Sequence, residues 1–222
     1  MDTSLLKFAS LSDVMERMGF DDGEYFLAHV QDLLVSHGVD PNITFRQLYK
    51  LFNVEFVVAV ANVLTYETEF LSIHTTPSMR VVDAVRASCG VPFLVPPVRV
   101  GPKKLYVDGS VIANYPYSYI TEQPARAGDH VIGCNIASWK PCEVECFSDL
   151  MYGVLGCVFS AGSSRGWPNT VEIDCSGVSY FDFDKPHSER QKLFDTGYRQ
   201  TVEYLDTKTS TQMTRHRRSS SI

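Results

Sequence analysis

The feature that most limits what this chain can fold into is an almost unbroken apolar run from residue 54 to residue 63. Its sequence is Val-Glu-Phe-Val-Val-Ala-Val-Ala-Asn-Val. A strand with one face in water alternates apolar and polar residues, whereas a strand covered on both faces is apolar throughout. The run therefore predicts a buried strand in a parallel or mixed sheet that is covered by helices.

Helices and further strands are predicted on both sides of this run. Three helices are bracketed by residues that favour helix ends: Asp21, Glu24 and Gly38 for the first, Thr44 and Gln47 for the second, and Thr76, Pro77 and Gly90 for the third, over 77–89. Apolar periodicity predicts strands over 66–73, 130–136 and 171–174 and helices over 148–160 and 188–205. Strands that alternate with helices are typical of the α/β class.

A strand that ends in a carboxylate is the most informative local motif. Residues 105–110 read Leu-Tyr-Val-Asp-Gly-Ser, so an apolar segment breaks at Asp108 and Gly109. Ligands and chemistry collect at the carboxyl edge of open α/β sheets, and glycine lets the backbone turn sharply there. Asp108 is therefore a candidate base. The alternative is an Asp-Gly turn whose carboxylate bonds only its own backbone.

Short motifs in a fixed order resemble those of the patatin-like phospholipases. They are Gly38-Val39-Asp40-Pro41 with Thr44-Phe45, Thr76-Pro77 with Ala87-Ser88 and Val91-Pro92-Phe93, Leu105 to Gly109 with Asn114 and Pro116, and Phe181-Asp182-Phe183 with Leu193 to Gly197. The resemblance implies a three-layer α/β/α fold with a mostly parallel central sheet. It implies a partial patatin-like domain over residues 1–206, clearest over 38–205, without the first strand and its Gly-rich nucleophile unit.

The resemblance also implies an activity, the hydrolysis of phospholipid or acylglycerol esters by a Ser–Asp dyad. Asp108 corresponds to the base of that dyad, and Ser110 stands where the family usually has Gly or Ala. Residues 1–37 contain only Gly19 and Gly23 and no G-x-S-x-G elbow. We therefore expect a hydrolase that is truncated or lacks the nucleophilic serine, and we expect these 222 residues to be inactive. The alternative is a non-catalytic patatin-fold module that binds lipid or protein.

Other candidate residues have simpler interpretations. Residues Gly162 to Gly166 match the pattern G-x-S-x-G. A nucleophile elbow lies between a strand and a helix, whereas here a helix-like segment precedes the match and Trp-Pro follows it, so a loop is predicted. The alternative is an esterase whose nucleophile is Ser164. The remaining polar candidates are expected to be surface, strand-end or loop residues. They are His29, His37, His74, Asp182 and Asp184.

Composition excludes some classes of function. The net charge of −6 argues against nucleic-acid binding, which needs a basic surface. The six cysteines match no zinc spacing, since Cys142 and Cys146 lack a second Cys/His pair, so neither a metal nor a cofactor is expected. The expected partner is a lipid ester substrate or a membrane surface, and protein partners stay open.

The two chain ends carry the remaining predictions. The first residues lack a basic segment followed by an apolar one, so no secretory signal is expected. The predicted location is cytoplasmic, either free or peripheral on membranes or lipid droplets. Residues 207–222 are rich in Ser, Thr and Arg, and they are predicted to be a disordered tail because they bury too little apolar surface.

Overall fold

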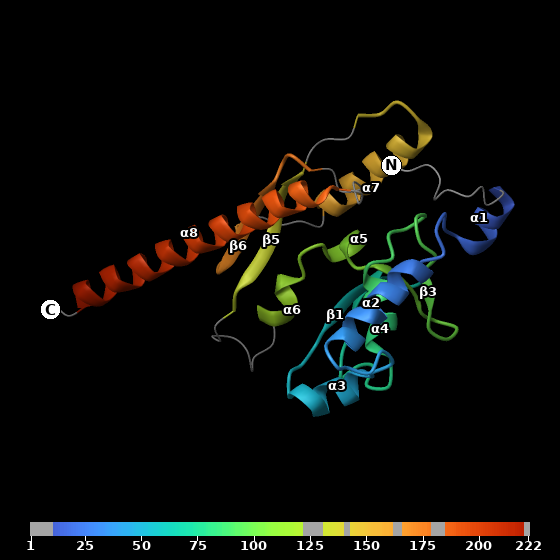
Figure 1. Ribbon diagram of the computed structural model, residues 1–222, viewed down its shortest axis with the longest axis horizontal. Coiled ribbons are helices and arrows are strands. Elements are labelled where there is room, and N and C mark those ends of the chain that lie inside the picture. The colour runs from blue at the N-terminus through green and yellow to red at the C-terminus, as the bar shows by residue number, and fades with distance from the viewer. Residues whose placement is uncertain (1–10, 122–130, 140–142, 162–165, 179–184, 220–222) are drawn as a thin grey trace. The chain divides into compact units, whose positions relative to one another are not determined.

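The computed structural model describes residues 11–121, 131–139, 143–161, 166–178 and 185–219, which belong to two compact units (Figure 1). The N-terminal unit holds residues 2–116 and 158–162, and the C-terminal unit holds residues 117–157 and 163–222. The boundary between the two units lies near Pro116, within the single domain that the sequence predicts over residues 1–206.

Four strands and five helices of the N-terminal unit are described. In chain order they are α1 (Leu11–Arg17), α2 (Glu24–Ser36), α3 (Phe45–Phe52), β1 (Val58–Asn62), β2 (Glu67–Leu71), α4 (Val81–Ser88), β3 (Val98–Arg99), β4 (Leu105–Asp108) and α5 (Ser110–Ala113). The strands form one sheet in the order β2-β1-β4-β3. Helix α4 packs against β1 and β4, and α2 packs against α4. The predicted α/β class is confirmed.

The direction of the strands in this sheet differs from the sequence prediction. Its three ladders are antiparallel, and Val60 of β1 lies opposite both Glu69 of β2 and Asp108 of β4. Two of these pairs are hairpins whose strands are joined by only a few residues, and such a connection can only give antiparallel neighbours. The mostly parallel sheet is therefore not found in this unit. The apolar run predicted burial correctly, since Val60 and Ala61 are fully buried, but burial does not determine strand direction.

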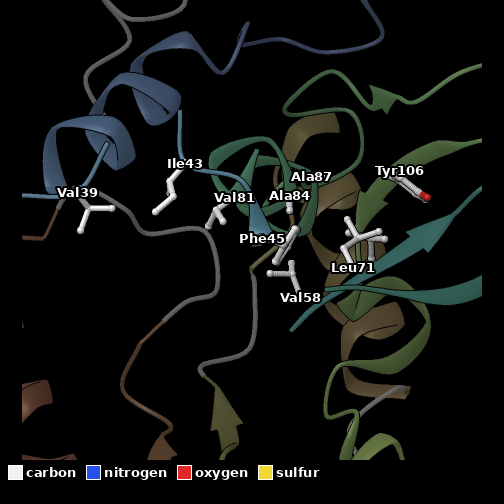
Figure 2. Close-up of a cluster of buried hydrophobic side chains, with 10 residues drawn as sticks. Val39, Ile43, Phe45, Val58, Leu71, Val81, Ala84, Ala87 and Tyr106 are labelled. Atoms are coloured by element: carbon white, nitrogen blue, oxygen red, sulfur yellow. The ribbon is translucent and has the colours of Figure 1, made fainter. Parts of the chain in front are cut away.

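The core of this unit lies between the sheet and the helices of one face (Figure 2). Its members come from the α2–α3 loop and α3, from β1, β2 and β4, and from α4. They are Val39, Ile43, Phe45, Val58, Val60, Leu71, Val81, Ala84, Ala87 and Tyr106. Burial of these side chains is the main favourable contribution to the stability of the unit, and it holds β4 in place beneath α4.

The predicted helix caps are partly correct. Thr44 and Gln47 form the expected capping box, and Gly38 follows α2 with a φ of +72° that favours glycine. The Asp21–Glu24 box is wrong, because α2 begins at Glu24 with Gly23 as its N-cap. The Asp21 carboxylate instead accepts the Gly23 N–H at 2.6 Å.

The third predicted helix begins later than expected. Helix α4 starts at Val81 rather than Pro77, and its N-cap is Arg80, which is extended with a ψ of 138°. The preceding residues use their backbone groups elsewhere, since the carbonyls of Pro77 and Met79 accept N–H groups from the start of α3. This non-local pairing outweighs the helix-start signal of Thr76-Pro77.

The C-terminal unit contains the parallel pairing. Its described elements are α6 (Tyr117–Thr121), β5 (Gly133–Trp139), most of α7 (Phe147–Ala161), β6 (Thr170–Cys175) and α8 (His187–Ser219). Strands β5 and β6 run parallel, and α8 packs against β6. Gly197 of α8 comes close to Ile173 of β6, because a Cβ on this glycine would lie 3.8 Å from the isoleucine side chain.

Helix α8 reaches further along the chain than the sequence predicted. It continues to Ser219, whereas a tail without regular structure was predicted from residue 207. Residues 198–219 contain neither Gly nor Pro, so nothing in this segment interrupts the backbone hydrogen bonds of a helix. The prediction of a tail rested on the small apolar surface that residues 207–222 could bury. The backbone hydrogen bonds of a helix form within the helix itself and do not require that burial.

None of the helices in the described ranges is both long enough and apolar enough to cross a membrane.

Candidate functional site

Asp108 is the last residue of β4, as the sequence predicted, and its backbone is fixed on two sides. It pairs with Val60 on β1, and its N–H donates to the carbonyl of Gly90 at 2.9 Å. Gly90 lies just beyond α4. Strand β1 and the loop after α4 therefore both hold the end of β4. The Asp108 side chain extends from a backbone that is fixed in position.

Gly109 is required for space rather than for its backbone conformation. Its φ of −62° is an ordinary right-handed value that any residue can adopt. A Cβ at this position would lie 2.6 Å from the carbonyl oxygen of Ala59 and 2.8 Å from its carbon. The close approach brings the first turn of α5 against β1, and it places Ser110 directly beside the Asp108 carboxylate.

The two oxygens of the Asp108 carboxylate have different surroundings. Oδ1 accepts the Ser110 N–H at 2.9 Å and the Ser110 hydroxyl at 2.6 Å. No residue in the described part of the chain donates to Oδ2. Burial raises the pKa of the Asp108 carboxyl above its ordinary value, and the two Ser110 bonds offset only part of that rise. A carboxylate with one oxygen held and a raised pKa is suited to accept a proton.

One of the two interpretations made from the sequence describes part of this carboxylate. The Asp-Gly turn interpretation accounts for Oδ1, which is bonded within its own turn. It does not account for Oδ2, which has no partner among the described residues. The turn thus orients the carboxylate and leaves one oxygen available to another group.

Cys89 is the neighbouring nucleophilic side chain, and it is a poor nucleophile. Loss of water around the sulfur, and then the charge of Asp108, raise the pKa of the Cys89 thiol, although part of this residue is exposed. A thiol with a raised pKa stays protonated near neutral pH. The adjacent Ser88 hydroxyl donates to the Ala59 carbonyl at 2.8 Å, so it braces α4 against β1.

The structure does not bring the other candidates from the sequence to Asp108. Ser164, Asp182 and Asp184 lie outside the described residues. His74 is 72% exposed, with its Nε2 3.6 Å from the Glu55 carboxylate. The other two histidine candidates, His29 and His37, are exposed on α2 and at its end. In the ranges that the structure describes, no group of three or more His, Cys, Asp or Glu side chains could hold a metal ion.

Sequence analysis missed a polar cluster centred on Glu69. This carboxylate accepts hydrogen bonds from Asn62 at 2.7 Å, from Lys104 at 2.8 Å and from Tyr106 at 2.7 Å. Burial by itself would raise the pKa of Glu69, but these bonds outweigh it and hold the pKa below its ordinary value. The signal was the single Asn at the end of the apolar run. Because its members bond one another, the cluster joins β1, β2 and β4 and supports the strand that carries Asp108.

An open groove of about 600 Å³ lies at the β3 edge of the sheet, and Asp108 does not line it. Its lining residues come from the loop before α4, from α4 and from the β3 region. They are Thr76, Pro77, Ser78, Met79, Asp83, Val98, Arg99 and Val100.

Replacing Asp108 by Asn should raise the melting temperature near pH 7 but not at low pH. The pKa of Asp108 is higher in the folded state, so the folded chain binds this proton more tightly. The charged form therefore costs stability above the ordinary carboxyl pKa of about 3.9, and the cost grows until the pH passes the folded-state pKa. Asn has the same shape, keeps an acceptor for Ser110 and has no charge.

The measurement is a series of thermal melts from pH 3 to pH 8, with Asp32→Asn as the control because Asp32 is exposed on α2. A lower melting temperature for Asp108→Asn at pH 7 would show that the half-buried charge of Asp108 does not cost stability.

Comparisons with known proteins identify the family that the motifs resemble. The sequence model of the family described as patatin-like phospholipase matches residues 2–120, which is more than half of the chain and includes β4 and α5. A curated viral protein, the "Probable lipid hydrolase 463L" of Invertebrate iridescent virus 6, is 22% identical over 123 residues. The match covers 51% of this chain and 42% of the viral protein.

A solved structure is similar in fold. VipD from Legionella pneumophila matches with a TM-score of 0.53 and 18% sequence identity, and the match covers 76% of this chain and 36% of VipD. The chain therefore spans less than half the length of either protein. At this level of identity the likeness to VipD concerns the fold alone.

Proposed function

The chain belongs to the patatin-like phospholipase family, as its motif order predicted, and we propose that it serves lipid ester hydrolysis with Asp108 as the general base. The observation that carries the proposal is the Asp108 carboxylate itself. It is half-buried at the end of a strand, Ser110 occupies Oδ1, and Oδ2 has no partner among the described residues. The name of the viral relative supports a lipid as the substrate class, and a phospholipid or acylglycerol ester is the expected form.

The proposed reaction is acyl transfer in two steps. Oδ2 of Asp108 takes the proton of a serine hydroxyl while the serine oxygen attacks the ester carbonyl, and the alcohol of the ester leaves with that proton. Water then attacks the acyl-serine, again with Asp108 as the proton acceptor, and the fatty acid is released as the serine recovers its proton. Asp108 is suited to this role because its raised pKa makes it a stronger base than a solvated carboxylate.

The attacking serine is proposed to come from a segment other than the Asp108 turn. Within the described ranges, Ser110 is the serine that bonds Asp108, and both its N–H and its hydroxyl point at Oδ1. A nucleophile must instead meet the ester carbonyl, with oxyanion donors nearby. We therefore expect the 222 residues by themselves to hydrolyse lipid esters slowly, because in the described ranges Asp108 bonds no hydroxyl other than that of Ser110.

The test is Asp108→Ala in two proteins, the 222-residue chain and the product of the full native transcript. In the 222-residue chain the variant should leave the residual rate unchanged. In a longer product that carries a G-x-S-x-G elbow, it should lower kcat/KM about 10²–10⁴-fold, the usual contribution of a general base. The measurement is release of fatty acid from phospholipid and from triacylglycerol, with Asp32→Ala as the matched exposed control.

Two outcomes would contradict parts of the proposal. A large loss on Asp108→Ala in the 222-residue chain would show that a serine within it already works with Asp108. A reading frame that closes just upstream of Met1, combined with no turnover, would favour a non-catalytic module that binds lipid or protein. Labelling with a long-chain fluorophosphonate, followed by peptide mass spectrometry, would identify the nucleophile, with Ser164 as one candidate.

A further inference from the structure

We propose that Ser110 is a positioning residue, whose hydroxyl holds Oδ1 of Asp108 so that Oδ2 is presented as the proton acceptor; the proposal rests on the proposed function. The two contacts of Ser110 with Oδ1 have different origins. The N–H bond is available to any residue except proline at this position, because it comes from the backbone. The hydroxyl bond requires serine or threonine.

The hydroxyl contact is the shorter of the two. At 2.6 Å it lies within the range of about 2.5–2.7 Å for a hydroxyl that donates to an ionised carboxylate, which is the stronger class of hydrogen bond. Two donors from one residue meet the same oxygen, so rotation of the carboxylate about its terminal bond would break both contacts. The free oxygen is therefore kept in one direction.

The backbone on both sides of this contact is fixed. The Asp108 N–H is bonded to Gly90, and the Gly109 backbone lies so close to Ala59 that it leaves no room for a side chain. Ser110 then begins α5, which packs against β1 and β2. Because neither residue is free to move relative to β1, the direction of the hydroxyl bond is determined by the fold.

The contact also sets the pH at which the base can act. Burial raises the pKa of Asp108, and the Ser110 hydroxyl bond is the larger of the two effects that lower it again. Among the described residues, Cys89 from the turn after α4 is the titratable side chain that interacts with this carboxylate. It is uncharged near neutral pH, so the hydroxyl is the side-chain group that favours the ionised form, in addition to the Ser110 N–H.

The experiment follows the titration of Asp108 itself in the full 222-residue chain. The ¹³C signal of the Asp108 carboxyl is assigned with Asp108→Asn and followed from pH 3 to pH 9 by NMR. In Ser110→Ala its pKa should move upward, and in Ser110→Thr, which keeps a hydroxyl, it should return toward wild type. Ser88→Ala is the matched control, because the Ser88 hydroxyl bonds the Ala59 carbonyl and not the carboxylate, and it should leave the Asp108 titration unchanged. Cys89→Ala should also leave the titration unchanged at pH values far below the pKa of the Cys89 thiol.

Asp108 titration curves that coincide in wild type and Ser110→Ala would overturn the positioning role. This result does not depend on hydrolysis, so it is distinct from failure of the proposed function. In a lipid-hydrolysing product the acid limb of the kcat/KM profile should move to higher pH in Ser110→Ala, while activity above that limb remains. Complete loss of activity at every pH, with fluorophosphonate labelling of Ser110 in the wild type, would also overturn the proposal by making Ser110 the nucleophile.

Discussion

Replacing Phe45 by Ala should destabilise the N-terminal unit by about 3–5 kcal/mol, the usual cost of removing a buried aromatic side chain. Phe45 begins α3 and is 2% exposed, in the centre of the core shown in Figure 2. Its ring stacks on Phe56 with 6.1 Å between the centroids. The loss has two parts, the apolar surface no longer buried and the cavity left between α4 and the sheet.

The control comes from the other end of the same helix. Phe52 is the last residue of α3 and is 52% exposed, so Phe52→Ala removes the same side chain and should cost less than about 1 kcal/mol. The measurement is urea unfolding, read from hydrogen exchange of the β1 amides, because both tryptophans lie in the C-terminal unit. Equal losses for the two variants would show that Phe45 is not part of a packed core.

Gly109→Ala should cost about 1–3 kcal/mol or more, although the backbone conformation at this position suits alanine. The new Cβ would meet the carbonyl oxygen of Ala59 at 2.6 Å, and the contacted atoms belong to the backbone of β1 rather than to a flexible side chain. Either β1 or the Asp108 turn must move. The Ser110 contacts with Asp108 should therefore be lost together with the stability.

Gly153→Ala is the matched control for this substitution. Gly153 lies within α7, and a Cβ there has no neighbour within 4 Å. Alanine at an open helical position should stabilise the protein by about 0.5–1 kcal/mol. Thermal melts of the two variants should therefore shift in opposite directions. A Gly109→Ala variant as stable as the wild type would show that the turn after β4 is not packed against β1.

Local signals in the sequence determined part of this protein correctly. The capping box of Thr44 needs only the next three residues, and the αL position of Gly38 needs only one. Asp108 was placed at a strand end because the apolar segment before it stops there. Each of these features depends on interactions that reach no further than one turn of helix or one strand, so the sequence alone contains them.

Tertiary structure decided what depends on partners far along the chain. It paired β1 with the distant strand β4, and it delayed the start of α4 to Val81 by pairing the preceding residues with the start of α3. It also gathered Asn62 and Glu69 with residues from β4.

The same limit applies to the candidate site. The sequence indicated the carboxylate of Asp108, but not which of its oxygens Ser110 would occupy. That outcome required Gly109 to lie against Ala59, a contact between residues fifty positions apart in the chain. A pattern of neighbouring residues predicts how a segment folds locally, whereas the choice among distant partners depends on the free energy of the whole packed unit.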